Sequence, residues 1–383
     1  MIRCPECKGK GLCGLPKCPV LQRFHAQVSE KPIQEYMGPA PSVFIGSRRY
    51  PHVLGGPLLL RDSDRPTDWV SRGYAIDDII AIRSRTIRGS QAIKSVLYQA
   101  QEVALSSRPL DVEATFEKPV RFDLSFDGTI APIGLAGTLS RVDILDNAVV
   151  EPAVDRYTSD TDIKANEAVS ALFQNKIDVY RITSLLTAGL LGSQRTFVPT
   201  RWAITAVDDM VSLDLRRRNE RMPPLQEIRI HTSLLYGNTI VVLLIPSADF
   251  RFEMIERWQK QSLWGGAEDV VVADGEGRKK RGYSPIAGAY YSARLAVLEH
   301  TTSLGRLARA LVIRDISGDY WAPLGTWVIR EATRAALRSD PIPCMDLASA
   351  EDVITSLLGS PFWRSHSNLL NDILVQRTFA DYT

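Results

Sequence analysis

Four of the chain's five cysteines lie within its first eighteen residues, with the spacing C-x2-C-x5-C-x4-C: Cys4, Cys7, Cys13 and Cys18. Four thiolates can close a tetrahedral shell around one Zn²⁺, and the free energy of metal binding then orders a segment that has few apolar side chains to bury. Because cysteine fills all four positions, we expect a structural zinc site. Two disulfide bonds or an iron–sulfur cluster are the alternatives, although the C-x2-C-x2-C run of bacterial ferredoxins is absent.

A short loop downstream carries side chains suited to phosphate. The sequence GSRRYPH contains Arg48, Arg49 and His52, and Gly55-Gly56-Pro57 follows it. Guanidinium groups bind phosphate oxygens through two parallel hydrogen bonds, and glycine lets backbone N–H groups approach a ligand closely. We therefore expect a phosphate, nucleotide or nucleic-acid site at this loop.

A second arginine cluster, Arg83, Arg85 and Arg88, repeats this chemistry. In an extended segment, residues 83 and 85 face the same side, so both guanidinium groups could grip one anion. Alternatively, these arginines form surface ion pairs with nearby carboxylates. The nearby carboxylates are Asp62, Asp64, Asp77 and Asp78.

Further candidates lie later in the chain. Arg201 and Arg294 could also contact phosphate, and Tyr290 and Tyr291, close to Arg294, could stack on a base. The two tyrosines belong to an apparently amphipathic helix, so packing in the core is the alternative for one of them.

Asp208 and Asp209 are the weak catalytic candidates. They follow a predicted strand, and two carboxylates at a strand end could hold Mg²⁺ for phosphoryl transfer. Adjacent strand residues point to opposite faces, so one of them could instead cap a helix. His231, His300 and Cys344 lie in apolar patterns, and we expect them to be packed in the core. No catalytic-triad signature, Walker loop or HExxH helix appears, so an enzyme is less expected than a binding protein.

Composition is that of a folded soluble protein. Of the 383 residues, 45% are hydrophobic and 23% charged, and no apolar run approaches the length of a membrane span. With a cysteine already at position 4, there is no room for the apolar region of a signal peptide, so we expect a cytoplasmic protein and no membrane partner. The net charge is only +2, yet residues 1–110 carry 16 Lys and Arg against 9 Asp and Glu. This local excess favours a phosphate-bearing partner.

The first half of the chain mixes helical and strand patterns. Helical periodicity extends from Asp77 to Leu105 and from Ile163 to Leu191. Alternation from Val120 to Val142 around Asp127-Gly128 predicts a β-hairpin. Phe197 to Val211 is typical of a strand.

The second half shows the same mixture. Residues 228–245 predict two strands joined at Tyr236-Gly237-Asn238. Helices are predicted near 287–300 and 325–337, on either side of a strand at 310–316. Because strands cluster in hairpins and do not alternate with helices, the predicted class is α+β, with a mixed or antiparallel sheet core, packed helices and a small Cys4 zinc-binding head.

Four segments have the character of family signatures. They are FIGSRRYPHVLGGPL (44–58), IRSRTIRGS (82–90), PTRWAITAVDD (199–209) and AGAYYSARLAVLEH (287–300). Together with the cysteine head, their order resembles the archaeal Nre family of DNA repair proteins (NreA and NreB type). The resemblance implies a role in the DNA damage response and a zinc-binding head.

The resemblance also implies a domain plan. It places a zinc-binding head at 1–24, an N-terminal Nre region at 25–274, a C-terminal Nre region at 275–375 and a tail at 376–383. The boundary falls in the polar loop Asp274–Pro285.

Some members of the family bind the sliding clamp (PCNA) through a C-terminal peptide. The tail QRTFADYT places Gln376, Phe379 and Tyr382 at positions 1, 4 and 7 of the clamp-binding Q-x-x-h-x-x-a pattern. The match is imperfect, because position 4 is usually a smaller aliphatic residue and Thr383 stands where a second aromatic is often found. Docking of this amphipathic end on its own domain is the alternative.

Three functions are compatible with these sequence features. The leading hypothesis is a DNA repair factor that binds nucleic acid or nucleotide phosphate and is recruited by the clamp. A phosphoryl-transfer or nucleotide-processing enzyme would use the arginine clusters with Asp208 or Asp209. A non-catalytic scaffold would use head and tail as docking modules.

Overall fold

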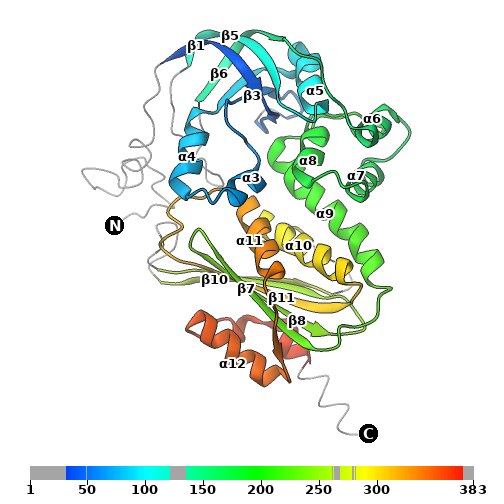
Figure 1. The fold of residues 1–383 in the computed structure, drawn as a ribbon, viewed down its shortest axis with the longest axis vertical. Helices are drawn as coiled ribbons and strands as arrows, with labels where there is room; N and C mark the ends of the chain where they lie inside the picture. Colours follow the sequence, from blue (N-terminus) through cyan, green and yellow to red (C-terminus); the bar gives the residue numbers. More distant parts are fainter. Residues whose placement is uncertain are drawn as a thin grey trace, which may run out of the picture. The chain divides into compact units, whose positions relative to one another are not determined.

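The computed structural model describes residues 32–48, 50–120, 135–260, 262, 268–277, 280 and 282–373, with the backbone alone at 94 and 95. These residues form two compact units, an N-terminal unit (32–211) and a C-terminal unit (212–373), and the division falls within helix α9 (Thr200–Asn219). Each unit contains a six-stranded mixed sheet with packed helices (Figure 1). The α+β class is therefore confirmed. The segments expected to form a zinc-binding head and a clamp-binding tail lie outside the described residues, and so does Arg49.

The sheet of the N-terminal unit has the order β1-β5-β6-β4-β3-β2, in which β4 and β6 are parallel and the other neighbours antiparallel. The strands are β1 (Ile33–Ala40), β2 (Ser42–Ile45), β3 (Leu54–Leu59), β4 (Ile87–Ala92), β5 (Leu110–Val120) and β6 (Leu135–Ile144). The helices are α3 (Pro66–Ser71), α4 (Ile76–Arg85), η1 (Ile93–Val96), α5 (Leu97–Leu105), α6 (Pro152–Ser159), α7 (Ala165–Gln174), α8 (Val179–Thr187) and the first part of α9.

One face of this sheet is buried. Alternate residues of β5, from Leu110 to Phe116, and Val43 and Ile45 of β2 face the core, where α5 and α8 pack. Phe44 of β2 and Arg88 of β4 alternate with buried neighbours and are only partly buried. The less covered face therefore carries one of the predicted phosphate-binding arginines.

Several local predictions for this unit need correction. Residues 77–105 are not one helical region, because strand β4 separates α4 from α5. Residues 163–191 contain the two helices α7 and α8, joined by a turn. Strands β5 and β6 are antiparallel neighbours, as the hairpin prediction requires, but its Asp127-Gly128 turn lies outside the described residues.

The predicted strand at 197–211 is wrong, because α9 begins at Thr200. The buried positions Ala203, Val207, Val211 and Leu215 recur every four residues, which places them on one helical face. This helical spacing can be read from the sequence. We predicted a strand because residues 197–211 are rich in β-branched side chains, which have a high strand propensity. Burial of one helical face outweighs that propensity.

The sheet of the C-terminal unit has the order β10-β9-β11-β8-β7-β12. Its strands are β7 (Ile228–Leu235), β8 (Asn238–Pro246), β9 (Phe252–Trp258), β10 (Val270–Glu276), β11 (Ala308–Ile316) and β12 (Ile342–Cys344). Its helices are α10 (Gly288–Leu304), α11 (Trp327–Arg338), α12 (Leu347–Leu358), η2 (Arg364–His366) and a final helical segment, residues 368–373. The predicted hairpin at 228–245 and the predicted helix–strand–helix order after residue 287 are confirmed.

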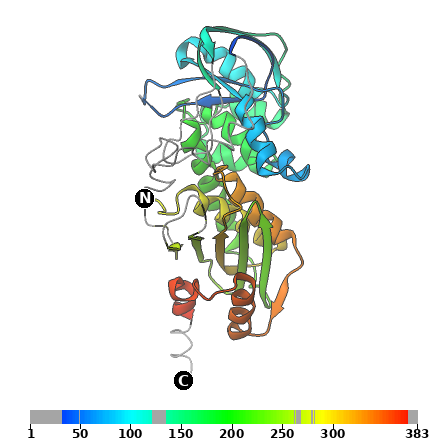
Figure 2. The ribbon, with the colours of Figure 1, turned by 90° about the vertical axis from the view of Figure 1, so that its left-hand side faces the viewer.

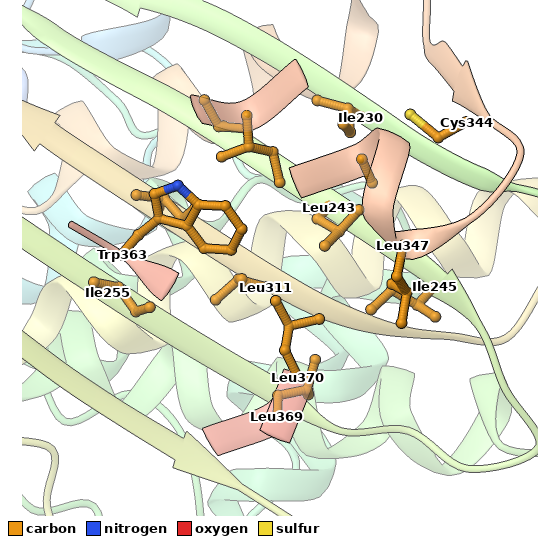
Figure 3. Close-up of a cluster of buried hydrophobic side chains, with 14 of the residues drawn as sticks. Ile230, Leu243, Ile245, Ile255, Leu311, Cys344, Leu347, Trp363, Leu369 and Leu370 are labelled. Atoms are coloured by element: carbon orange, nitrogen blue, oxygen red, sulfur yellow. The ribbon is translucent and has the colours of Figure 1, made fainter. Parts of the chain in front are cut away.

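Helices cover both faces of the second sheet. Helix α11 packs on β7 and β8 and also contacts α10, whereas α12 and the final helical segment pack on the opposite face (Figures 1 and 2). On that opposite face, strand residues such as Leu243 and Leu311 meet Trp363 and Leu370 in a buried apolar cluster (Figure 3). This sheet therefore has cores on both sides.

The junction of the two Nre regions expected at residue 274 and the division between the compact units lie at different places. Strand β10 ends at Glu276, within the polar loop 274–285, and pairs with β9, and β11 follows the loop and pairs with β9 as well. Both sides of the loop thus belong to one sheet, and the compact units separate instead within α9.

Candidate nucleic-acid interface

The loop between β2 and β3 is closed tightly at its base. Ile45 pairs with Gly55 across the two strands, and the backbone N–H of Gly46 donates to the carbonyl oxygen of Leu54 at 2.9 Å. The residues between them include Arg48 and His52, which are both exposed. The hairpin base therefore holds a loop from which two of the predicted side chains, Arg48 and His52, are exposed.

Contrary to our expectation, Gly55 and Gly56 do not provide free backbone N–H groups for a ligand. Both lie within β3, between β2 and β4, where their backbones belong to the sheet. A Cβ at Gly56 would lie 2.6 Å from the carbonyl oxygen of Gly89, and one at Gly55 would lie 2.7 Å from that of Phe44. These glycines allow close packing of three strands, which corrects the expectation that their amides face a ligand.

The first turn of α9 meets this loop. The backbone N–H of Ile45 donates to Oγ1 of Thr200 at 2.9 Å, although 155 residues separate them. Trp202 then lies against Tyr50, with ring centroids 5.1 Å apart and the rings inclined by 60°. The guanidinium carbon of Arg201 is 6.0 Å from the centre of the Trp202 ring.

We call the exposed group Arg48, Tyr50, Arg201 and Trp202 the Arg–aromatic surface. Its side chains come from two segments about 150 residues apart, and all four residues are exposed to solvent. Guanidinium groups beside half-exposed rings can bind phosphate and stack on bases. The sequence predicted Arg48 and Arg201 as phosphate-binding residues, but Tyr50 and Trp202 were not predicted to belong to the site. An aromatic residue next to arginine in both segments was the available signal.

Arg88 is a second candidate, because it is only partly buried and forms no ion pair with a described carboxylate. Its guanidinium carbon lies 4.9 Å from the centre of the Phe44 ring, and its Nε atom is buried without a hydrogen-bond partner among the described residues. Burial lowers the pKa of Arg88 to about 10. A desolvated cation gains much from an approaching anion, so this position suits a phosphate oxygen.

Arg83 and Arg85 do not form the predicted pair. They belong to the last turn of α4, not to an extended segment, and two helical residues at this spacing point about 200° apart. Arg85 forms an ion pair with Asp62 at 3.1 Å, and Arg83 lies over the ring of Trp69 at 5.3 Å. For Arg85 the alternative of a surface ion pair is therefore confirmed.

Arg294 lies in the interior of the C-terminal unit. Its side chain is 1% exposed and forms an ion pair with Glu276 at 2.8 Å, and Arg216 pairs with the same carboxylate at 3.3 Å. Tyr290 and Tyr291 are also buried, and burial raises the pKa of the Tyr290 hydroxyl well above its usual value. The expected phosphate contact of Arg294 is therefore wrong. The core packing that we considered for one of the two tyrosines is observed for both, so neither is available to stack on a base.

Asp208 and Asp209 occupy the middle of α9, not the end of a strand. Asp208 is fully buried, and consecutive helical residues point about 100° apart. The geometry proposed for two carboxylates on one metal ion is therefore wrong. Among the described residues, no group of three or more His, Cys, Asp or Glu side chains is arranged to hold a metal ion.

Of the three residues predicted to lie in the core, His231 and Cys344 are buried and His300 is partly buried. His231 is 2% exposed, its Nδ1 atom lies 3.1 Å from the carbonyl oxygen of Ser339, and its ring is 5.3 Å from that of His300. Cys344 is buried with a free thiol. In the part of the chain that the structure covers, no helix is both long and apolar enough to cross a bilayer.

The sequence was compared with known protein families. The family model described as "Archaeal Nre, N-terminal" matches residues 12–265, and the model described as "Archaeal Nre, C-terminal" matches residues 276–382. No solved structure matches the chain.

Relatives of known name resemble nearly the whole chain. A "DNA repair protein NreA" of Archaeoglobus fulgidus is 35% identical over 355 residues, covering 89% of this chain and 90% of the relative. A protein of the same name from Haloferax volcanii is 34% identical, covering 84% and 83%. A "DNA repair protein NreB" of Archaeoglobus fulgidus is 34% identical, covering 86% and 87%. Since both family descriptions and these relatives span most of its length, the chain belongs to the archaeal Nre family.

Proposed function

We propose that this chain is a DNA repair protein that binds DNA through the Arg–aromatic surface and Arg88. The names of its relatives support the repair role. The observation that carries the DNA-binding part is the meeting of Tyr50 and Trp202, which gathers two arginine-bearing segments at one exposed place.

The arginines of this surface are available for phosphate. Neither Arg48 nor Arg201 forms an ion pair with a described carboxylate, whereas Arg85 is paired with Asp62. An arginine without an internal partner gives up no existing ion pair when it binds phosphate, and it releases counterions from DNA. This availability distinguishes the surface from the other predicted cluster.

Equilibrium DNA binding as a function of salt concentration tests the proposal. The double variant R48A/R201A should weaken binding and lower the slope of log affinity against log salt by about 2, about one per lost phosphate contact. Arg141→Ala is the matched control, since Arg141 is exposed but paired with Asp143. Binding that does not respond to salt, or equal losses in both variants, contradicts the proposed surface.

We further propose that the tail recruits the protein to the sliding clamp. The final helical segment, 368–373, leads into the tail, and Glu253 accepts hydrogen bonds from the backbone N–H groups of Asn368 and Leu369. These hydrogen bonds fix the backbone at residues 368 and 369, a few positions before the tail in the sequence. Two aromatic anchors in a short peptide can supply most of the affinity for a clamp pocket.

Titration of the full-length chain with purified archaeal sliding clamp tests the recruitment. The variant F379A/Y382A should abolish binding, and Gln376→Ala should weaken it, because these side chains occupy the pattern positions. Thr378→Ala, between pattern positions, is the control. Clamp binding without DNA binding at low salt favours the scaffold, and clamp binding unaffected by F379A/Y382A removes the tail from the proposal.

Zinc in the cysteine head is the third part of the proposal. Cys4, Cys7, Cys13 and Cys18 supply a complete tetrahedral donor set, whose ion would order the segment and supply no reactive water. Elemental analysis of chain purified without chelator should find about one zinc ion per chain. Cys13→Ser should lower that content, and Cys344→Ser should not. Zinc-free wild-type protein would contradict this part.

A further inference from the structure

Trp202 is the most exposed of the tryptophans that the structure describes. It is 42% exposed, whereas Trp258 is partly buried and the other described tryptophans are buried, and its partner Tyr50 is 47% exposed. Exposing two large rings leaves apolar area in water that burial would remove, at about 25 cal/mol for each Å². Paired exposed rings of this kind mark a binding site more often than scattered single ones do.

The pair is also held in place before any ligand arrives. The bond from Ile45 to Thr200 joins α9 to the end of β2, and the bond from Gly46 to Leu54 closes the loop that carries Tyr50. Side chains fixed in this way lose little conformational entropy when a ligand binds. The two rings therefore form a preorganised stacking platform.

We infer that Tyr50 and Trp202 stack on unpaired bases, so that the protein prefers single-stranded DNA to duplex. The inference deepens the proposed function and depends on it. With the rings inclined by 60°, an edge of one meets the face of the other, and both residues keep more than 40% of their surface exposed. In a duplex, base faces are already stacked on one another, so only unpaired bases can use the platform.

The neighbouring positive charges favour a nucleic acid over a cationic protein segment as the ligand of the two rings. Arg201 lies beside the Trp202 ring, and Arg48 shares the loop with Tyr50. The Arg201 guanidinium beside the Trp202 ring, together with the charge of Arg48 on the loop of Tyr50, repels a cationic ligand and attracts the phosphates that flank a stacked base. Aromatic rings with adjoining arginines are the combination that single-strand binders use.

The test compares affinities for oligothymidylate of about 15 nucleotides and for a duplex of equal length at one salt concentration. Trp202→Ala should lower single-strand affinity between about fivefold and one-hundredfold, with less than about a twofold change for duplex. Trp202→Phe should restore most of the loss, and Trp202→Leu, which keeps apolar volume without a π face, should not. Tyr98→Ala is the control, because Tyr98 is 65% exposed on α5 in the same unit.

The outcomes separate this inference from the function on which it depends. Equal losses for both forms of DNA, no loss for either, or rescue by Trp202→Leu would overturn the stacking platform while leaving phosphate-based binding in place. A wild-type chain that binds neither form at low salt would overturn DNA binding itself, and the platform with it. A thermal midpoint near that of wild type shows that each variant is folded.

Discussion

Arg257 on β9 lies directly opposite Asp315 on β11, and its Nε and one terminal nitrogen donate to the two carboxylate oxygens at 2.8 and 2.6 Å. One position earlier, Glu256 lies opposite Arg314, whose guanidinium donates to it at 2.6 Å. Consecutive strand residues face opposite sides, so one ion pair lies on each face of the sheet. A slip of one residue would place like charges together, and this register of the parallel strands is therefore specified by charge.

Removing one partner of the buried pair should be costly. Asp315→Ala leaves the buried Arg257 with only its longer contact to Asp269, at 3.4 Å. We expect the free energy of unfolding to fall by about 3 kcal/mol in chemical denaturation. Asp143→Ala breaks an exposed pair with Arg141 and should cost less than about 1 kcal/mol. Similar losses in the two variants would contradict the role of burial.

Glu253 should stabilise the final helical segment locally. Its buried carboxylate accepts hydrogen bonds from the Ser367 hydroxyl at 2.6 Å and from the Asn368 backbone N–H at 2.8 Å. Glu253→Ala leaves these donors unpaired and should lower the free energy of unfolding by about 1–3 kcal/mol. Hydrogen exchange should become faster at Leu369 and Leu370. Unchanged protection there would show that the segment does not depend on this carboxylate.

Acid should destabilise the protein through His300. Burial, with smaller contributions from His231 and Arg229, lowers the pKa of His300 from 6.5 to about 4. The unfolded chain therefore binds a proton between these values that the folded chain does not, and stability falls as pH decreases from about 6.5 toward about 4. Because the ring is partly solvated, we expect a loss of about 1–2 kcal/mol, measurable by urea denaturation at a series of pH values.

The variant His300→Gln isolates this effect, because glutamine does not titrate. Its stability should depend less on pH between about 4 and 6.5 than that of wild type. Residual dependence should remain, since burial also lowers the pKa of His231. An identical pH dependence in the variant and wild type would exclude His300 as the origin.

Gly56→Ala should disrupt the sheet of the N-terminal unit. The added methyl group would lie 2.6 Å from the carbonyl oxygen of Gly89, a backbone atom that cannot move away alone. We expect a loss of about 3 kcal/mol or more, or failure to fold, in thermal denaturation. Gly277→Ala is the control, since no atom of the described residues, its chain neighbours aside, lies within 4 Å of its added Cβ. A stable Gly56→Ala variant would indicate that the strands separate easily.

Prediction from sequence succeeded where the local pattern and the tertiary environment agree. The hairpin at Tyr236-Gly237-Asn238 was predictable because turn-forming residues lie between two apolar segments. In the structure, Tyr236 and Gly237 adopt the positive φ of a tight turn, and the two strands pair. The prediction failed at 197–211, where β-branched residues obscured the helical spacing of Ala203, Val207 and Val211.

By itself, the sequence determined the family, the α+β class and which residue types are able to contact phosphate, because these depend on motif order, periodicity and side-chain chemistry. Only the tertiary structure decided which arginines are available. Glu276, which lies outside helix α10, forms an ion pair with Arg294, whereas Arg88 has no ion pair with a described carboxylate. Trp202 contacts Tyr50, although more than 150 residues separate them in the sequence. Charge pairing and burial depend on neighbours distant in the chain, and local spacing carries no record of them.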